Sequence, residues 1–346
     1  MSMAVFWPIS ANSLNSLLSR TNGGIMNAVL DKISKIGIVP VVKINRAEDA
    51  LPLAKALCAG GLPCAEITFR TDAAAESIRI MTEHFPQMCV GAGTVLTTDQ
   101  VDAAIAAGAK FIVSPGLNPR IVRYCIEKEI PITPGTSSPS ELEQAIELGQ
   151  DVVKFFPAEQ SGGLAKIKAM AAPYTNMKFM PTGGIHAGNL NSYLDFGRVI
   201  ACGGSWMVPG SLIDAGSFTE IEQLVRDAVR TMLGFELSHI GINAPDESAA
   251  QAAANRFAFL FGMPVKDGAG SVFAGTALEV MKKPYLGQNG HIAIKTNYID
   301  RAVNYLSTVL QAEFDPSTEK RDAKGTLKAV YLKEEIGGFA VHLLQK

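Results

Sequence analysis

Residues 150–159, QDVVKFFPAE, place a lysine inside an apolar run whose β-branched and aromatic side chains are typical of a buried strand. Burial disfavours an ammonium group, so a lysine in such a strand either finds a partner or loses its proton. An unprotonated amine attacks carbonyl carbons. Lys154 is therefore a candidate nucleophile, although an exposed sheet edge or a simple ion pair would also accommodate it.

Similar strand-like runs surround this segment and alternate with helical patterns. Several helical patterns open on Ser or Thr followed by an acidic residue, and close on Gly, as helix caps require. The eight runs lie at 37–44, 64–70, 89–96, 111–116, 131–136, 152–158, 178–185 and 199–208. Successive βα units in this number predict an α/β fold, a parallel (β/α)₈ TIM barrel, over residues 25–234.

The pattern of the chain changes after residue 234. SHIGIN (238–243) resembles GHIAIKT (290–296), and each copy continues with a helical pattern and further short strands. A duplicated unit usually pairs with its copy. We therefore expect a second, α+β domain of paired βαβββ units over residues 236–346, and a poorly ordered N-terminal extension over residues 1–24.

Composition and charge narrow the classes of function. The net charge is -2 and no basic patch is interleaved with aromatic residues, which argues against nucleic-acid binding. The N-terminal segment lacks the basic start of a signal peptide and is interrupted by Pro8 and polar residues, so neither secretion nor membrane insertion is expected. The 5 cysteines lack paired spacing, which indicates reduced thiols and a cytoplasmic protein.

The alternation of side chains along a strand brings a carboxylate toward the lysine. Glu66, Thr68 and Arg70 share one face of the second predicted strand, and Lys154 and Phe156 share one face of the sixth. Strands two and six lie across the barrel in the same alternating set, so Glu66 and Lys154 are expected to meet inside its mouth. A buried ion pair is the structural alternative. As functional groups, the two suit Schiff-base formation with proton transfer by the carboxylate.

Clusters of glycine follow the last three predicted strands. Backbone N–H groups in such loops and at helix N-termini bind anions, and the loops after strands seven and eight commonly hold phosphate in this fold. Each glycine pair is also an ordinary turn signal, so the phosphate prediction depends on finding all three in succession. The residues are Gly162, Gly163, Gly183, Gly184, Gly203, Gly204 and Ser205.

The predicted strand ends carry motifs that resemble a known family. In chain order they are LPCAEITFRT, VGAGTV, VSPG, VKFFPAE, PTGGI and CGGSW. Together they resemble the class I aldolases that act on 2-keto-3-deoxy-6-phosphogluconate (KDPG) and 4-hydroxy-2-oxoglutarate (KHG). The resemblance spans residues 25–234 and implies a lyase that forms a Schiff base with a keto-acid phosphate and needs no cofactor. It also implies a homotrimer and a place in the Entner-Doudoroff pathway of carbohydrate metabolism.

The same resemblance implies a role for each matching residue. Lys154 would be the Schiff-base lysine and Glu66 the general acid/base. The implied substrate contacts are Arg70, Thr94, Pro115, Phe156 and Thr182, and the implied phosphate contacts are Gly162, Gly163, Gly183, Gly184, Gly204 and Ser205. Two alternatives remain open: an aldolase for the 6-phosphogalactonate epimer, and a sugar-phosphate binding or regulatory protein that acts through the C-terminal module.

The duplicated C-terminal unit resembles the vicinal-oxygen-chelate domains of the glyoxalase I family. In that family the first and last strands of each unit supply metal ligands, which implies a divalent metal site here. The matching residues are His239, Glu279, His291 and His342, the last in place of a more usual glutamate. Such a set suits Zn, Ni or Fe. The alternative is a scaffolding or binding domain in which these are ordinary strand residues.

Overall fold

The computed structural model describes residues 18–21 and 24–346. Their contacts divide the chain into two compact units, with the division between Val229 and Arg230 inside helix α10 (Phe218–Leu233). The last turn of α10 belongs to the second unit, because the side chain of Thr296 donates a hydrogen bond of 2.7 Å to its final carbonyl. The expected boundary near residue 234 thus falls just beyond the end of this helix.

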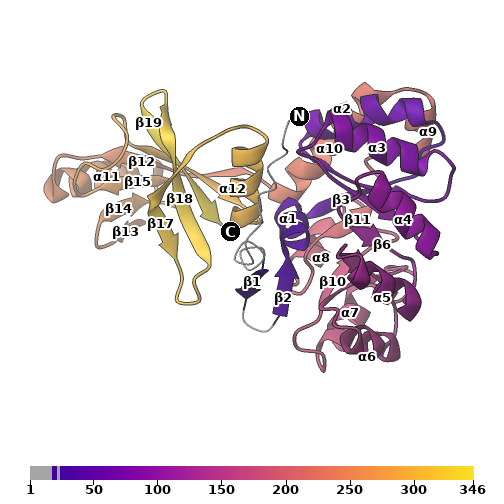
Figure 1. Cartoon of the computed structure of the whole chain (residues 1–346). Helices are drawn as coiled ribbons and strands as arrows, with labels where there is room; N and C mark the ends of the chain where they lie inside the picture. The colour runs from indigo at the N-terminus through magenta and orange to yellow at the C-terminus, as the bar shows by residue number, and fades with distance from the viewer. Residues whose placement is uncertain (1–17, 22–23) are drawn as a thin grey trace, which may run out of the picture. The chain divides into compact units, whose positions relative to one another are not determined.

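The first unit contains a parallel sheet curled into a barrel (Figure 1). Neighbouring strands in sequence are neighbours in the sheet, as right-handed βα units require. The strands are β3 (Ile38–Val42), β4 (Cys64–Thr68), β5 (Cys89–Gly93), β6 (Ile112–Val113), β7 (Ile132–Thr133), β8 (Gly135–Thr136), β9 (Val152–Phe155), β10 (Lys178–Pro181) and β11 (Cys202–Gly204). Most are shorter than the predicted runs, whose ends leave the sheet as loops.

Two irregularities interrupt the ladder of this barrel. Pro134 has no N–H group and separates β7 from β8, so these two short strands together fill one strand position. Between β10 and β11 the described residues form only two isolated bridges, Phe179↔Val199 and Thr182↔Gly203. Because β11 pairs with β3, the strand order still runs around the barrel.

Helices follow the strands and cover the outside of the barrel (Figure 1). Capping residues set several of their starts, and Ser138 and Glu141 form a complete capping box. The helices are α1 (Ala28–Ile36), α2 (Ala50–Gly60), α3 (Ala74–His84), α4 (Thr98–Ala106), α5 (Pro119–Glu127), α6 (Pro139–Glu147), α7 (Gly163–Ala171), α8 (Leu190–Leu194) and α9 (Gly210–Asp214).

The second unit is a separate mixed sheet made of two copies of a β-α-β-β-β element. The first copy is β12 (Glu236–Asn243), α11 (Glu247–Phe261), β13 (Val265–Asp267), β14 (Ser271–Ala274) and β15 (Leu278–Met281). The second copy is β16 (His291–Thr296), α12 (Ile299–Thr308), β17 (Phe314–Arg321), β18 (Leu327–Ile336) and β19 (Phe339–Gln345). The copies join through the antiparallel pair β12–β16. The predicted fold class, an α/β barrel followed by paired βαβββ units, is confirmed.

Little of the expected N-terminal extension falls within the described part of the chain. Residues 1–17 and 22–23 lie outside it, and the strand β1 (Leu18–Thr21) pairs antiparallel with β2 (Gly24–Asn27). In the described residues, no helix combines the length and the apolar character needed to cross a membrane.

Candidate active site

Lys154 on β9 and Glu66 on β4 meet inside the barrel. Nζ of Lys154 lies 3.4 Å from Oε1 of Glu66, and the side chains are 6% and 0% exposed. The second carboxylate oxygen, Oε2, is buried and has no hydrogen-bond partner among the described residues. Leaving a buried acceptor unpaired costs free energy, unless a water or a reacting group binds there. The carboxylate therefore presents one oxygen to the amine and keeps the second free of partners among the described residues.

Gly93 on β5 makes room for this carboxylate. A methyl group at Gly93 would lie 2.2 Å from Oε1 and 2.6 Å from Cγ of Glu66, so any larger residue would displace the side chain. We assigned Gly93 no role from the sequence. The signal was present in the GAGTV motif, but its meaning depends on which side chain faces the glycine across the strands.

Of the predicted substrate residues that follow β4 and β9, one contacts the amine and the other lies at the surface. The ring centroid of Phe156 lies 5.1 Å from Nζ of Lys154, so this ring forms one wall of the site. Arg70 lies beyond the end of β4 and is exposed, and its Nε donates a hydrogen bond of 3.1 Å to Oγ1 of Thr68. Arg70 also lines a surface pocket of about 370 Å³ with Phe69, Thr71, Asp72, Ala75 and Gln100.

The other predicted substrate residues lie where strands leave the sheet. Thr94 directly follows β5 and has a left-handed backbone with φ of 56°, a conformation that concentrates at functional sites. Thr182 follows β10, and its hydroxyl is buried without a partner in the described part of the chain. A methyl group at Gly203 would lie 2.3 Å from that hydroxyl, so the glycine permits its approach. Pro115 follows β6 and is partly buried.

The glycine loops differ in how their backbone groups are used. The N–H groups of Gly162 and Gly163 donate to carbonyls within the turn after β9, at 3.2 Å and 2.9 Å. Gly183 and Gly184 have φ of 101° and 77°, and the hydrogen bonds described for them use only their carbonyls. Of these two predicted phosphate loops, only the one at 183–184 therefore has N–H groups without a hydrogen-bond acceptor among the described residues, as an anion site needs.

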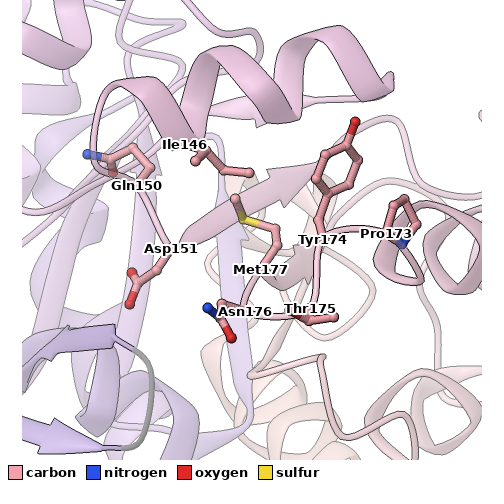
Figure 2. A pocket seen from close by; sticks show the side chains of 8 residues that line it. All are labelled: Ile146, Gln150, Asp151, Pro173, Tyr174, Thr175, Asn176 and Met177. Atoms are coloured by element: carbon pink, nitrogen blue, oxygen red, sulfur yellow. The ribbon is translucent and has the colours of Figure 1, made fainter.

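A second pocket lies at the opposite end of the barrel (Figure 2). It has a volume of about 360 Å³ and is lined by Ile146, Gln150, Asp151, Pro173, Tyr174, Thr175, Asn176 and Met177. Asp151 and Met177 immediately precede β9 and β10, which places the pocket at the amino ends of these strands. Active sites of parallel barrels form at the carboxyl ends, so this pocket does not belong to the Lys154 site.

In the second unit, three histidines and a glutamate converge on one face of the sheet. Oε2 of Glu279 lies 2.9 Å from Nε2 of His239 and 3.2 Å from Nε2 of His291. A ligand atom from each of His239, His291 and His342 falls within 4.8 Å of the others. All three rings are buried. Val280, next to Glu279, points to the other face and packs under α11, so the cluster is not part of the α11 core.

The electrostatics of this cluster favour a neutral imidazole beside an ionised carboxylate. Burial, together with His291 and His239, lowers the pKa of His342 to about 3. Burial also raises the pKa of Glu279, but hydrogen bonds from His239, His291 and Ser271 outweigh it and hold the pKa well below its usual range. Neither ring nitrogen of His342 has a hydrogen-bond partner among the described residues. The donor set and its unpaired nitrogens fit a divalent metal.

A buried lysine facing a carboxylate inside a parallel barrel is the arrangement that Schiff-base chemistry needs, and comparison with known proteins gives the family. Residues 29–224 match the family described as "Aldolase: KDPG and KHG aldolase". The chain belongs to this aldolase family.

Individual relatives agree with this assignment. The chain is 49% identical to the 2-dehydro-3-deoxy-phosphogluconate aldolase of Treponema pallidum over 205 residues, which cover 59% of this chain and 98% of the relative. The solved KDPG aldolase of Legionella pneumophila, with pyruvate captured as a covalent carbinolamine intermediate, is 38% identical with a TM-score of 0.56, covering 57% and 97% of the two chains. The solved aldolase of Zymomonas mobilis with 3-phosphoglycerate is also 38% identical, with a TM-score of 0.55. The match covers 57% of this chain and 94% of the Zymomonas chain. The chain is an aldehyde-lyase of the KDPG aldolase type.

Proposed function

We propose that Lys154 and Glu66 carry out the retro-aldol cleavage of KDPG to pyruvate and glyceraldehyde 3-phosphate, with KHG as a second substrate. The main support is the 3.4 Å approach of the amine to the carboxylate inside the barrel. The carbinolamine captured in the Legionella enzyme is the product expected when a lysine amine adds to pyruvate. The Treponema relative is named for the phosphogluconate, which disfavours the galactonate alternative.

Each bond change has a group placed for it. The amine of Lys154 attacks C2 of the keto acid, and Glu66 returns a proton to the departing hydroxyl, so that water leaves and an iminium forms. Glu66, again a carboxylate after this step, accepts the C4 hydroxyl proton, and the C3–C4 bond breaks. The bonding electrons enter the iminium to give an enamine, and the aldehyde departs. Protonation at C3 and hydrolysis release pyruvate and restore the amine.

Binding residues at the barrel mouth orient the substrate in this proposal. The guanidinium of Arg70 suits the carboxylate, because its fork of donors matches two oxygens. The part of the site around the reacting carbons is lined by Thr94, Pro115, Phe156 and Thr182. The loop at Gly183 and Gly184, with Gly204 and Ser205, holds the phosphate at the other end of the substrate, and Gly162 and Gly163, whose N–H groups donate within their own turn, border this site. The phosphoglycerate in the Zymomonas neighbour is consistent with a phosphate site in the family.

A coupled assay of pyruvate release from KDPG tests the catalytic proposal. Lys154→Ala is expected to reduce turnover to background, since the nucleophile is gone. Lys168→Ala is the matched control, because Lys168 also lies over a phenylalanine ring, 5.8 Å from the centroid of Phe196, but on helix α7. Cleavage by Lys154→Ala at the rate of the control would overturn the assignment.

We further propose that the second unit is a glyoxalase-like domain whose His239, Glu279, His291 and His342 hold a divalent metal. Its paired βαβββ units and the 4.8 Å histidine cluster support this. A metal bound there would act as a Lewis acid toward an oxygen ligand. The protein residues would supply three imidazole nitrogens and one carboxylate, with Ser271 holding Oε1 of Glu279 at 2.6 Å.

Calorimetric titration of the metal-free full chain with Zn²⁺, Ni²⁺ and Fe²⁺ tests this second proposal. One site per chain is expected, and His342→Ala should weaken it by at least about tenfold, as the loss of a ligand does. His84→Ala, an exposed histidine on α3, is the control and should bind as the parent does. Absence of binding would leave a metal-free binding or scaffolding domain.

We also propose a cytoplasmic homotrimer that takes part in the Entner-Doudoroff pathway. The trimer is implied by the aldolase family. The 5 cysteines, all within the described residues, are free thiols, which agrees with a reducing compartment. Light scattering after size-exclusion chromatography tests the trimer, and a stable monomer would contradict it.

A further inference from the structure

Glu159, at the end of the VKFFPAE motif, has a buried partner that the catalytic proposal does not use. The hydroxyl of Tyr193, on α8, donates a hydrogen bond to Oε1 of Glu159. Tyr193 is 2% exposed, whereas Glu159 is exposed. Burial, and then the neighbouring carboxylate, raises the pKa of Tyr193, which keeps its proton available for this bond.

The same hydroxyl also reaches the start of α7, because it lies against Gly163, the first residue of that helix. Tyr193 on α8 therefore connects to the turn after β9 and the adjoining start of α7, with its bonded partner Glu159 lying 34 residues earlier in the chain. Loss of the hydroxyl alone would break the bond to Glu159 while keeping the ring.

Glu159 and Tyr193 together contact two of the proposed phosphate loops. A methyl group at Gly184 would lie 2.6 Å from Cγ of Glu159, so the stem of the glutamate packs directly on this loop. A methyl group at Gly163 would lie 3.2 Å from the Tyr193 hydroxyl and 3.3 Å from Oε1 of Glu159. The backbone N–H of Glu159 also donates 3.1 Å to the carbonyl of Gly183.

A carboxylate beside an anion site requires an explanation, because like charges repel. Glu159 cannot favour phosphate through its own charge. We attribute its role instead to its contacts. Its stem packs on Gly184, its backbone N–H binds the carbonyl of Gly183, and its carboxylate accepts a hydrogen bond from Tyr193.

We propose that Glu159 and Tyr193 are positioning residues for the phosphate end of the substrate, which fix the spacing between the loops at 162–163 and 183–184. The proposal rests on the phosphate site proposed above. It assigns the pair to affinity for phosphorylated substrates and not to the chemistry at Lys154. Disruption of the pair therefore affects KDPG and leaves pyruvate, which has no phosphate, unaffected.

Steady-state kinetics of Tyr193→Phe and Glu159→Gln in the full chain test this assignment. For Tyr193→Phe we expect the KM for KDPG to rise by about tenfold, the effect of losing a charge-assisted hydrogen bond, with kcat nearly unchanged. Glu159→Gln keeps an acceptor oxygen for Tyr193 and should show a smaller rise. The pyruvate concentration that half-saturates borohydride inactivation should stay at the parent value in both.

A matched control comes from the other end of the barrel. Tyr174 donates a hydrogen bond of 3.0 Å to Glu143, the same kind of pair away from the phosphate loops. Tyr174→Phe should leave the KM for KDPG unchanged. If Tyr193→Phe raises the KDPG and pyruvate constants equally, or changes neither, the positioning role is wrong.

Competition by inorganic phosphate distinguishes a failure of the Tyr193–Glu159 proposal from a failure of the phosphate site on which it rests. Phosphate should compete with KDPG in the parent protein, and Tyr193→Phe should weaken that inhibition by the same factor as the KM. Failure of phosphate to compete in the parent would overturn the phosphate site itself. Competition in the parent with unchanged inhibition in Tyr193→Phe would overturn only the role of the Tyr193–Glu159 pair.

Discussion

At the scale of single residues, the site depends on where one carboxylate can fit. Glu66 is fully buried, with one oxygen toward Lys154 and the other without a partner among the described residues. Gly93 provides the space, since a methyl group there would overlap Oε1. The position of a general acid/base within hydrogen-bonding reach is what makes it effective.

Gly93→Ala tests this dependence. The added methyl group should push Glu66 away from the amine and lower kcat for KDPG by about a hundredfold, the lower end of what proton transfer by a side chain contributes. Gly197→Ala is the control, because in the described part of the chain a methyl group there would contact nothing within 4 Å beyond its own chain neighbours. Near-parent kcat in Gly93→Ala, with both variants folded by circular dichroism, would show that the carboxylate does not need its observed position.

Some of these residues were accessible from the sequence and others were not. Alternation along two strands was enough to predict that Glu66 and Lys154 meet, and the 3.4 Å contact agrees. The role of Gly93 depends on the register between β4 and β5, which one sequence does not reveal. Tyr193 and Glu159 meet through a long-range contact between a short helix and a loop, for which no periodic signal exists.

At the scale of elements, the two copies of the second unit form the histidine cluster by pairing. Gly241 on β12 lies opposite His291 on β16, and a methyl group at Gly241 would lie 2.0 Å from Cε1 of the histidine ring. The ring therefore folds over the glycine, which brings Nε2 of His291 to 3.2 Å from Nε2 of His239. The first strands of both copies are needed for the cluster.

Gly241→Ala should consequently weaken metal binding without removing a ligand. We expect the dissociation constant for Zn²⁺ to rise by about tenfold or more, as it does when ligand orientation is lost. Gly270→Ala is the control in the same unit, since among the described residues its methyl group would meet only its chain neighbours within 4 Å. Calorimetry on both full-length variants makes the comparison, and equal affinities would contradict the idea that this strand pair shapes the site.

Element boundaries were harder to predict than element identity. The strand predicted over 89–96 ends at Gly93 in the structure. The strand predicted over 131–136 is divided into two short strands at Pro134. In the first case the backbone leaves the sheet at Thr94, although the sequence continues to resemble a strand, whereas in the second the ladder resumes at β8, which pairs with β9. The order of βα units and the duplication of βαβββ were predictable, because both depend on repeats and periodicity.

At the scale of the whole molecule, the chain joins an aldolase barrel to a unit that lies outside its match to the Treponema relative. The Treponema relative is covered over 98% of its length by 205 residues of this chain, so a barrel of that size is a complete protein there. A chain ending after residue 234 should therefore fold and keep kcat/KM for KDPG within about twofold. A much larger loss in the pyruvate-release assay, with a folded product, would show that the second unit contributes to catalysis.

The central claim is that one amine, Lys154, forms the covalent intermediate. Incubation of the full chain with pyruvate and sodium borohydride, followed by peptide mass spectrometry, tests it most directly. We predict a single reduced pyruvate adduct on the peptide that contains Lys154, and none in Lys154→Ala. An adduct on another lysine, or inactivation without any adduct, would contradict this account.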